Sequence, residues 1–554
     1  MTAETLNVPS QQGAGRPPEL AAPARPSPVR GLWARLARRC ALVPLIVLAP
    51  LVAMAPTADH RFNVYQAGGL YRGNPLLIVP DSLHEVTTYL RLGNFRPLGR
   101  IVEKSLDLLA YLMTDLFGVP ANVALRLVSF GSAIVLTLLA VLFTESLISR
   151  GRLRLTAPST LSAVLPYAVA ATFVAAGRTS TTVLFGGLYL LTTALVLGVG
   201  ALVCRVVAVD RHRLGRARAV LAVLLGAGIA AFNELACLAV PLVVAAVLIR
   251  GRWVLALSWR RTLTGPGARA AALIVAGFLP VAGTVRQIIH GYCTVRSCYE
   301  SSAVALTGAT AEALPVRMLA WLPPLGWQQA VPNGPGRWLA GLLPALALGA
   351  LAVLAWRTTK DLPLLSTVDR RQALGLSAAA LVLLTLAATI AALSGEVQAV
   401  VAAGDWGRGW RDSGATAAGG MLVLLGLSFA LVVRPAGRRR LVPGLLTLFV
   451  LAAAVTAAAN RRFDDGIARS AAAELDNRIA LEVTDFDTSA AGNLRRCALL
   501  DEALALSRAA RSRTSVRRYP QVLDLVAERK AARPFCLPAA TTSTTAPGLA
   551  TAGR

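Results

Sequence analysis

The sequence predicts an all-α, polytopic membrane bundle of about 11 spans, with an amphipathic helix in an outer loop and a small helical C-terminal domain. Of the 554 residues, 55% are hydrophobic, and the mean hydropathy is +0.58. Apolar runs of about 17 to 25 residues recur along most of the chain, which is enough for a helix to cross a bilayer. Arginines cluster in short segments between these runs, as they do in cytoplasmic loops.

The charge balance is strongly basic. The formal net charge is +27, from 56 Lys and Arg against 29 Asp and Glu. In a soluble chain this excess would suggest a nucleic-acid partner. No nucleic-acid-binding motif accompanies the charge, and the arginines lie at the ends of apolar runs, so we interpret them as topology signals and expect no nucleic-acid partner.

The N-terminal region sets the predicted topology. Residues 1–39 are rich in Pro, Ala, Gly and Arg, and we expect a disordered cytoplasmic tail. The apolar run begins only at Ala41, too late for a signal peptide, so the first span, 41–56, is predicted to be a retained helix. Four arginines between residues 30 and 39 precede it and place the following loop, 57–120, outside the cell.

The membrane domain is predicted to occupy residues 40–459. Each even-numbered span ends on basic residues, as alternating crossings require. The segment between Arg218 and Arg250 is interpreted as two short crossings that turn at Asn233 and Glu234. The other spans after the first are expected at 121–148, 160–176, 183–207, 270–289, 338–356, 373–393, 415–433 and 441–459.

The odd number of spans places the C-terminus outside. Residues 460–538 are therefore predicted to form an extracytoplasmic domain, since long segments are translocated largely regardless of charge. Apolar residues at helical spacing predict helices within 464–490, 494–511 and 521–532. Residues 539–554, rich in Thr, Ser, Ala and Pro, are expected to be a disordered tail.

Four of the seven cysteines fall in predicted outer segments, where the compartment is oxidising. We expect disulfides between Cys293 and Cys298 and between Cys497 and Cys536. The alternatives are four free thiols or a metal site. No His lies among these cysteines at zinc spacing, so we expect no metal.

Several chemistries are excluded by the absence of their motifs. The sequence has no glycine-rich phosphate loop after a strand, no HExxH and no GxSxG. Only four histidines are present. A nucleotide-driven pump is not supported, and we expect no cofactor.

The order of parts around the outer loop resembles a known class of enzymes. A first span is followed by an acidic outer loop, by Asn94-Phe95-Arg96-Pro97-Leu98-Gly99-Arg100, and by Leu116-Phe117-Gly118-Val119-Pro120 before the second span. This order is similar to that of the GT-C class of membrane glycosyltransferases of bacteria. The resemblance implies transfer of a sugar from a polyprenyl-phosphate donor to a cell-envelope acceptor on the outer face. It also implies a catalytic acid at Asp59, although His60 stands where that class often has a second acid.

Residue chemistry gives an independent argument for the same loop. Transfer from a lipid-linked sugar needs a carboxylate to take a proton from the acceptor and cations to hold the phosphate. Asp81 and Glu85, four apart and so on one helical face, are the second choice of acid. Guanidinium groups bind phosphate bidentately, and aromatic rings can stack on sugars. The candidate binding residues are His60, Arg61, Arg72, Arg96, Arg100, Trp406 and Trp410.

Each candidate also has a structural interpretation. Asp59 can cap the first span, the arginines can lie on the solvated face of an interfacial helix, and the tryptophans can anchor the chain at the interface. Two other functions stay open: a transporter or flippase of lipid-linked glycans, and a non-catalytic envelope-assembly protein. A transporter predicts ionisable groups at mid-membrane depth and repeats, whereas the charges here lie mainly at span ends. The composition and the placement of arginines indicate a GC-rich bacterium, and in a bacterium we expect a multi-pass protein to reside in the plasma membrane.

Overall fold

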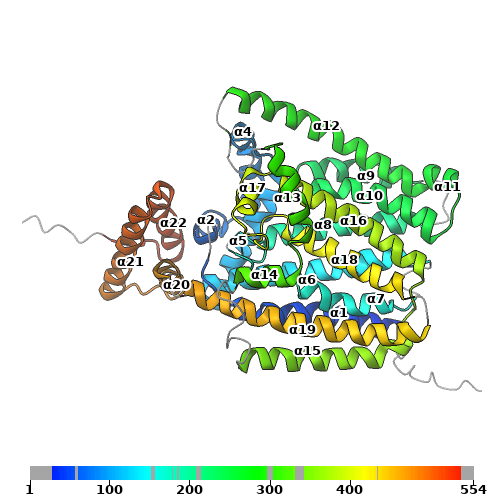
Figure 1. Cartoon of the computed structure of the whole chain (residues 1–554). Helices are drawn as coiled ribbons and strands as arrows, with labels where there is room; N and C mark the ends of the chain where they lie inside the picture. The colour runs from blue at the N-terminus through cyan, green and yellow to red at the C-terminus, as the bar shows by residue number, and fades with distance from the viewer. Residues whose placement is uncertain are drawn as a thin grey trace, which may run out of the picture.

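The structure is a computed structural model and describes residues 28–56, 60–150, 156–177, 179–183, 186–207, 214–295, 298, 304–330, 342–432, 435–468 and 470–537. The regular elements in these ranges are all helices, and no β-strand is formed (Figure 1). Two isolated bridges, Ser159 with Ser366 and Val304 with Ser394, join loops. The all-α prediction is confirmed for the described part of the chain.

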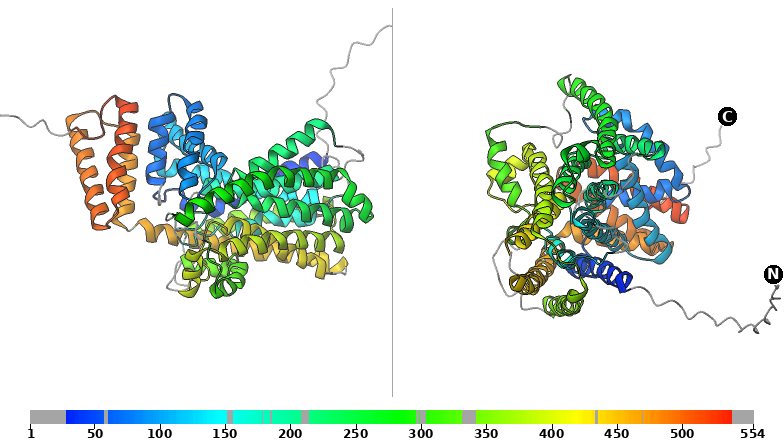
Figure 2. Two further views of the ribbon diagram at one scale, coloured as in Figure 1. Left: turned by 90° about the horizontal axis from the view of Figure 1, so that it is seen from above. Right: turned by 90° about the vertical axis from the view of Figure 1, so that its right-hand side faces the viewer.

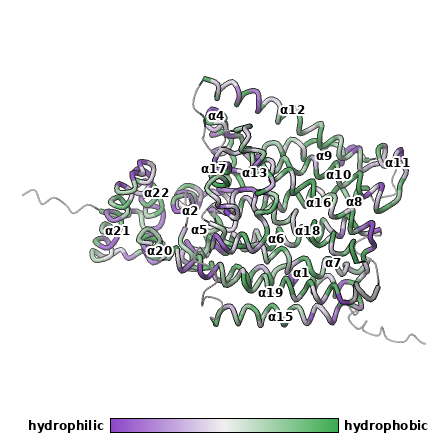
Figure 3. Tube along the Cα trace, in the orientation of Figure 1, coloured by the Kyte–Doolittle hydropathy of each residue, from purple (hydrophilic) through white to green (hydrophobic). Residues whose placement is uncertain are grey.

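Eight helices of the described chain are long and apolar enough to cross a membrane, which supports a multi-pass membrane protein. Figure 3 shows apolar residues along these helices and polar residues near their ends. The eight are α6 (Ala121–Ile148), α8 (Gly186–Val207), α10 (Ala239–Ile249) with the turns that flank it, α12 (Pro266–Val295), α15 (Leu342–Asp361), α16 (Arg370–Ala392), α18 (Ser413–Leu431) and α19 (Pro435–Ala468).

Three further predicted spans are helices that do not meet this length and hydropathy standard. These are α1 (Pro28–Leu48), which carries arginines in its first half, and the shorter α7 (Thr160–Ala170) and α9 (Arg216–Ala230). All three pack among the bundle helices. The count of 11 spans therefore stays a prediction.

The start of α1 corrects one sequence-based expectation. The sequence predicts that residues 28–39 belong to the disordered tail, but the helix begins at Pro28. Leu32, Leu36 and Cys40 repeat at helical spacing and are buried in the bundle. Arg39, itself buried, pairs with Asp361 at the end of α15. Burial of this stripe and compensation of the charge explain why the helix extends into the arginine-rich segment.

The third predicted span, 160–176, is helical only as far as Ala170. Beyond Ala170, side chains of α19 form hydrogen bonds with backbone N–H and C=O groups that no longer have helical partners. Thr456 donates to the carbonyl of Ala171 (2.7 Å), and Asn460 accepts from Ala175 N–H (2.8 Å) and donates to the carbonyl of Phe173 (3.0 Å). These hydrogen bonds satisfy backbone groups that would otherwise be buried without a partner once the helix ends.

Residues 60–117, which we call the outer segment, form a group of helices at one end of the bundle (Figure 1). We call this the outer end because the sequence predicts that it faces outside; its orientation stays a prediction. The helices of the outer segment are α2 (His60–Tyr71), η2 (Pro75–Leu77), α3 (Ile78–His84), α4 (Val86–Arg91) and α5 (Pro97–Phe117). α5 buries one face against α2, α6 and α8 and ends at Gly118, which has a left-handed φ of 64°. The arginine-rich segment around α11 (Trp259–Thr264) lies at the opposite end.

The C-terminal helices lie beyond the outer end, next to α2 (Figures 1 and 2). They are α20 (Ala471–Thr484), α21 (Ala490–Ala509) and α22 (Arg513–Ala531). They share one hydrophobic core with α2, α5 and α6, in which Phe62 meets Tyr519 edge to face with ring centroids 4.9 Å apart. The C-terminal helices are therefore anchored to the outer segment rather than standing apart from it.

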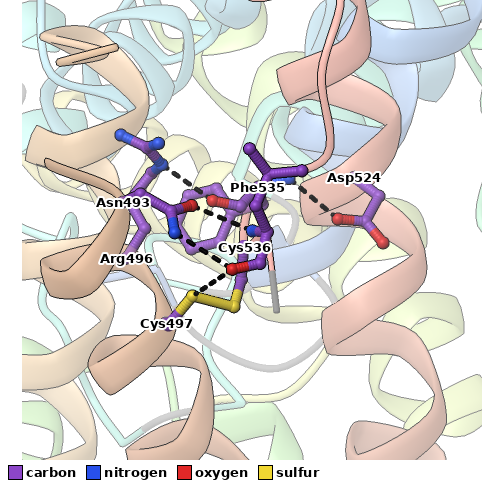
Figure 4. The surroundings of a disulfide bond; sticks show 7 residues. Asn493, Arg496, Cys497, Asp524, Phe535 and Cys536 are labelled. Atoms are coloured by element: carbon purple, nitrogen blue, oxygen red, sulfur yellow. Dashed lines mark hydrogen bonds between the residues drawn. A yellow bond between two sulfur atoms is a disulfide. The ribbon is translucent and has the colours of Figure 1, made fainter. Parts of the chain in front are cut away.

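Two disulfides stabilise this end, and they join the pairs expected from the sequence. Cys293 is joined to Cys298 at the end of α12, where the bridge packs on Gly93 after α4. Cys497 of α21 is joined to Cys536 (Figure 4). Around this bridge Arg496 donates to the carbonyl of Phe535 (2.7 Å). The second bridge thus fixes the segment after α22 onto α21.

Candidate functional site

The candidate site begins where α5 starts. Leu98 N–H donates to the carbonyl of Ala231 (3.0 Å), at the end of α9. Gly99 approaches so closely that a Cβ there would lie 2.1 Å from the carbonyl oxygen of Phe232. Only glycine permits this approach of two backbones. The first turn of α5 is therefore held directly against the turn between α9 and α10.

Arg96 and Arg100, one helical turn apart, flank this contact. Arg96 Nη1 donates to the Tyr189 hydroxyl on α8 (3.4 Å). Arg100 Nη1 donates to Glu103 (2.9 Å), and its guanidinium lies 4.4 Å from the centroid of the Tyr89 ring. Burial lowers the pKa of Arg96, but Glu103, Tyr189 and Glu234 outweigh it and raise that pKa above its ordinary value. The Arg96 side chain therefore stays charged.

These two arginines line a small cavity of about 10 Å³ at the base of the outer segment. Ser82 of α3, only 1% exposed, lines it as well. Among the described residues, Arg96 Nε, Arg100 Nε and Ser82 Oγ find no hydrogen-bond partner. Buried polar groups are almost always paired, so three unpaired polar atoms on residues around one cavity indicate a missing partner. A cavity of about 10 Å³ holds at most one water molecule, and a larger group with several acceptors could reach these atoms only if the side chains around the cavity moved apart.

Two buried acids stand behind the arginines on α5, and a histidine joins them. Glu103 and Asp107 are 5% and 3% exposed, and His60 Nδ1 lies 3.3 Å from Asp107 Oδ1. Burial raises the pKa of Glu103, but Arg100 and Arg96 outweigh it and hold that pKa below its ordinary value. Burial raises the pKa of Asp107 above its ordinary value, against the opposing effect of His60. The site thus combines a firmly ionised acid with one that protonates more readily.

Sequence reasoning missed Glu103 and Asp107. A signal was present: the two acids are four apart and fall on the same face of α5 as the buried Gly99, Ala110 and Tyr111. Ionisable residues within the apolar stripe of an amphipathic helix are buried when the helix packs, and buried charges are normally paired. Applying that test to α5 would have singled out both acids.

The predicted acids are placed differently. Asp59 lies outside the described residues. Asp81, on α3, is hydrogen-bonded to Tyr71 of α2, and Glu85 accepts from Lys104 of α5 (3.0 Å). Neither lines the cavity of Arg96 and Arg100. Both are placed where they stabilise the packing of the outer helices.

The other predicted arginines lie away from the cavity. Arg61 Nε lies 3.8 Å from Asp476 of α20, and Arg72 Nε donates to Asp115 of α5 (2.7 Å). Arg61 therefore connects the outer segment to the C-terminal helices, and Arg72 connects two outer helices. Of the four arginines assigned to a phosphate, the structure brings Arg96 and Arg100 together.

The tryptophans lie on the loop that precedes α18. Trp406 is 54% exposed, whereas Trp410 is 8% exposed and packs against Ala391 and Val397. Arg411, which follows, donates to Glu234 in the turn after α9 (3.2 Å). Glu234 in turn acts electrostatically on Arg96. The loop before α18 is thus connected to Arg96 through one carboxylate.

No three His, Cys, Asp or Glu side chains of the described chain lie close enough together to hold a metal ion. The site that emerges is a pair of guanidinium groups with buried acids behind them, at one end of a helical membrane bundle. Comparison of the chain with models of known families, with curated proteins and with solved structures finds no match.

Proposed function

We propose that this chain is a membrane glycosyltransferase that moves a sugar from a polyprenyl-phosphate donor to a cell-envelope acceptor on the outer face. The observation that carries the proposal is that Arg96, Arg100 and Ser82 line one cavity at the outer end, and that each has a buried polar atom with no partner among the described residues. A phosphate presents several oxygens that accept such hydrogen bonds, and arginine donors suit it in charge and shape.

The surroundings of the arginines favour a site for a charged group. Arg100 is compensated by Glu103, and Arg96 has the neutral Tyr189 hydroxyl as its bonded partner. An anion in the cavity would therefore meet one guanidinium whose charge is not fully used by a bonded carboxylate. Because the site is largely shielded from water, that interaction is stronger than at an exposed surface.

The proton acceptor of the reaction is the acid that the resemblance indicates, Asp59, with Asp81 and Glu85 as alternatives. His60, the next residue after Asp59, is buried and held by Asp107. Asp107 and Glu103 are themselves too deeply buried to meet an acceptor directly. Their role in this proposal is to fix His60 and Arg100.

A non-catalytic role in envelope assembly is the second candidate, and two observations favour it. Arg61 and Arg72 form internal ion pairs, and the outer segment shares a core with α20–α22, as expected of a scaffold. No comparable observation in the described part of the chain favours the transporter alternative. Arg126, buried in α6, donates to the carbonyls of Ala55 (3.0 Å) and Val183 (2.9 Å) and so has a packing role.

The binding step is tested with the full chain in lipid nanodiscs. Native mass spectrometry compares the occupancy of undecaprenyl phosphate with that of undecaprenol, which lacks the phosphate. We expect a preference for the phosphate that falls about tenfold or more in Arg96→Gln and Arg100→Gln, since each loses a charge-assisted bond. Arg478→Gln, which removes an exposed ion pair with Glu502 in the C-terminal helices, is the control. Equal binding of the two lipids would contradict the proposal.

The transfer step is tested separately in cells that lack the protein. Asp59→Asn is introduced, and the glycan composition of the envelope is measured at matched protein levels. We expect the composition to stay that of the deletion strain. Full restoration by Asp59→Asn, together with intact phosphate preference, would favour the assembly role over the enzyme.

A further inference from the structure

A second cavity, of about 40 Å³, lies at the outer end between the broken segment after α7 and the loop before α18. It is also bordered by the short helices α13 (Gly308–Leu319) and α14 (Pro323–Ala330). Its lining includes Thr172, Ser180, Arg317, Trp321, Arg408 and Ala417. The volume suits about three water molecules or a few hydroxyl groups at the edge of one sugar ring.

Two buried polar atoms belong to residues that line this cavity and have no bonded partner among the described residues. They are the hydroxyl oxygen of Ser180, which is 1% exposed, and Nε of Arg317, which is 2% exposed. The other nitrogens of Arg317 are used: Nη1 donates to the carbonyl of Arg408 (2.7 Å) and Nη2 to Asp412 (2.5 Å). A ligand that both donates and accepts hydrogen bonds would satisfy Ser180 and Arg317 together.

The charges around the cavity favour a neutral ligand over an anion. Arg317 is compensated by the buried Asp412, and Arg408 lies near Asp405 (3.8 Å). This distinguishes the cavity from that of Arg96, whose hydrogen-bond partner is a neutral hydroxyl. A phosphate would gain little here, whereas hydroxyl groups would find both donors and acceptors.

Hydrogen bonds hold the Trp321 ring and the backbone that line the cavity in place. The indole N–H of Trp321 donates to the carbonyl of Met318 (2.7 Å), which fixes the ring. Gly409 N–H donates to the carbonyl of Ala176 (2.7 Å), which joins the loop before α18 to the broken segment. The non-helical backbone after α7 both lines the cavity and is hydrogen-bonded to the loop before α18.

We propose that this cavity binds the hydroxyl edge of a neutral saccharide, with Ser180 and Arg317 bonding to hydroxyl groups and Trp321 facing an apolar part of the ring. Leu190 of α8 lines the cavity, and the residue before it, Tyr189, contacts Arg96. Consecutive residues of α8 therefore connect this cavity with the side chain of Arg96. The inference concerns a different set of residues from the phosphate site and does not depend on the transfer reaction.

The test uses the full chain in detergent and saturation-transfer difference NMR, which detects weak binding. The probes are methyl α-D-mannopyranoside and methyl α-D-glucopyranoside, with sodium phosphate as the competing anion. Ser180→Ala removes the hydroxyl without adding volume, and Ala417→Val adds two methyl groups beside the cavity. The control is Ser428→Ala on α18, whose hydroxyl donates to the carbonyl of Leu424 (2.8 Å) in its own helix.

We expect at least one glycoside to bind and phosphate not to displace it. Ser180→Ala should weaken binding about two- to tenfold, as expected for one neutral hydrogen bond. Ala417→Val should abolish binding, and Ser428→Ala should leave it unchanged. The proposal is overturned if the wild type binds neither glycoside, which would mean that the cavity holds water only. It is also overturned if phosphate displaces the glycoside, or if Ser180→Ala and Ala417→Val both bind like the wild type.

Discussion

The close contact at Gly99 allows one substitution to test how the outer segment is held on the membrane bundle. In Gly99→Ala the added Cβ would lie 2.1 Å from the carbonyl oxygen of Phe232. The neighbour is backbone in a packed turn, so it cannot rotate away. The first turn of α5 must therefore move, and the Leu98-to-Ala231 hydrogen bond (3.0 Å) is lost with it.

The magnitude follows from three contributions. Overpacking costs about 1 to 3 kcal/mol, and the lost hydrogen bond about 0.5 to 1.5 kcal/mol. The higher helix propensity of Ala relative to Gly stabilises the variant by up to about 1 kcal/mol. The net destabilisation is about 0.5 to 4.5 kcal/mol. Because Arg96 and Arg100 flank the contact, the phosphate preference should fall as well.

Hydrogen exchange with mass spectrometry measures the effect on α5, and thermal unfolding in detergent measures the effect on stability. Gly131→Ala is the matched control, since Gly131 lies within helix α6 and nothing lies within 4 Å of its added Cβ. We expect faster exchange at the start of α5 and a lower unfolding midpoint for Gly99→Ala only. Unchanged exchange and an unchanged midpoint in Gly99→Ala would refute the described contact.

Three further predictions concern stability. Replacing Cys497 and Cys536 by Ser should destabilise the C-terminal helices by about 4 kcal/mol, because this disulfide closes a loop with a sequence separation of 39. Replacing Cys293 and Cys298 should cost only about 2 kcal/mol, because their separation is 5, and chemical unfolding measures both effects. Asp412→Leu should lower the free energy of unfolding by about 3 to 5 kcal/mol, because it leaves Arg317 buried without its ion-pair partner. The double variant with Arg317→Leu should regain much of this stability, as measured by thermal unfolding. Burial raises the pKa of Asp476 above its ordinary 3.8, so the stability that this group contributes is present below 3.8 and is lost as the pH rises through the higher native value. Asp476→Asn should remove that part of the pH dependence, and retention of the full dependence would assign it to another group.

The helical bundle could be predicted because its evidence is local. Apolar runs such as Ala121–Ile148 have the length of a membrane helix, and the arginines that follow alternate in position. The same evidence failed at residues 28–39 and 171–176. There the outcome depends on partners far along the chain, Asp361 for the start of α1 and Asn460 for the end of α7.

The candidate site was predicted only in part for the same reason. The sequence places Arg96 and Arg100 near an acidic loop, but it does not show that Ser82 completes their cavity or that Arg61 and Arg72 pair with other acids. These assignments need the packing of α2, α3 and α5. The resemblance to GT-C enzymes indicated Asp59 and gave no indication of the buried pair Glu103 and Asp107.

The most direct test of the central claim is a cryo-electron microscopy structure of the full chain in a nanodisc that contains undecaprenyl phosphate. We predict the phosphate within hydrogen-bond distance of Arg96 Nε, Arg100 Nε and the hydroxyl of Ser82. A phosphate located elsewhere on the protein, with the cavity that Arg96, Arg100 and Ser82 line unchanged, would contradict the account.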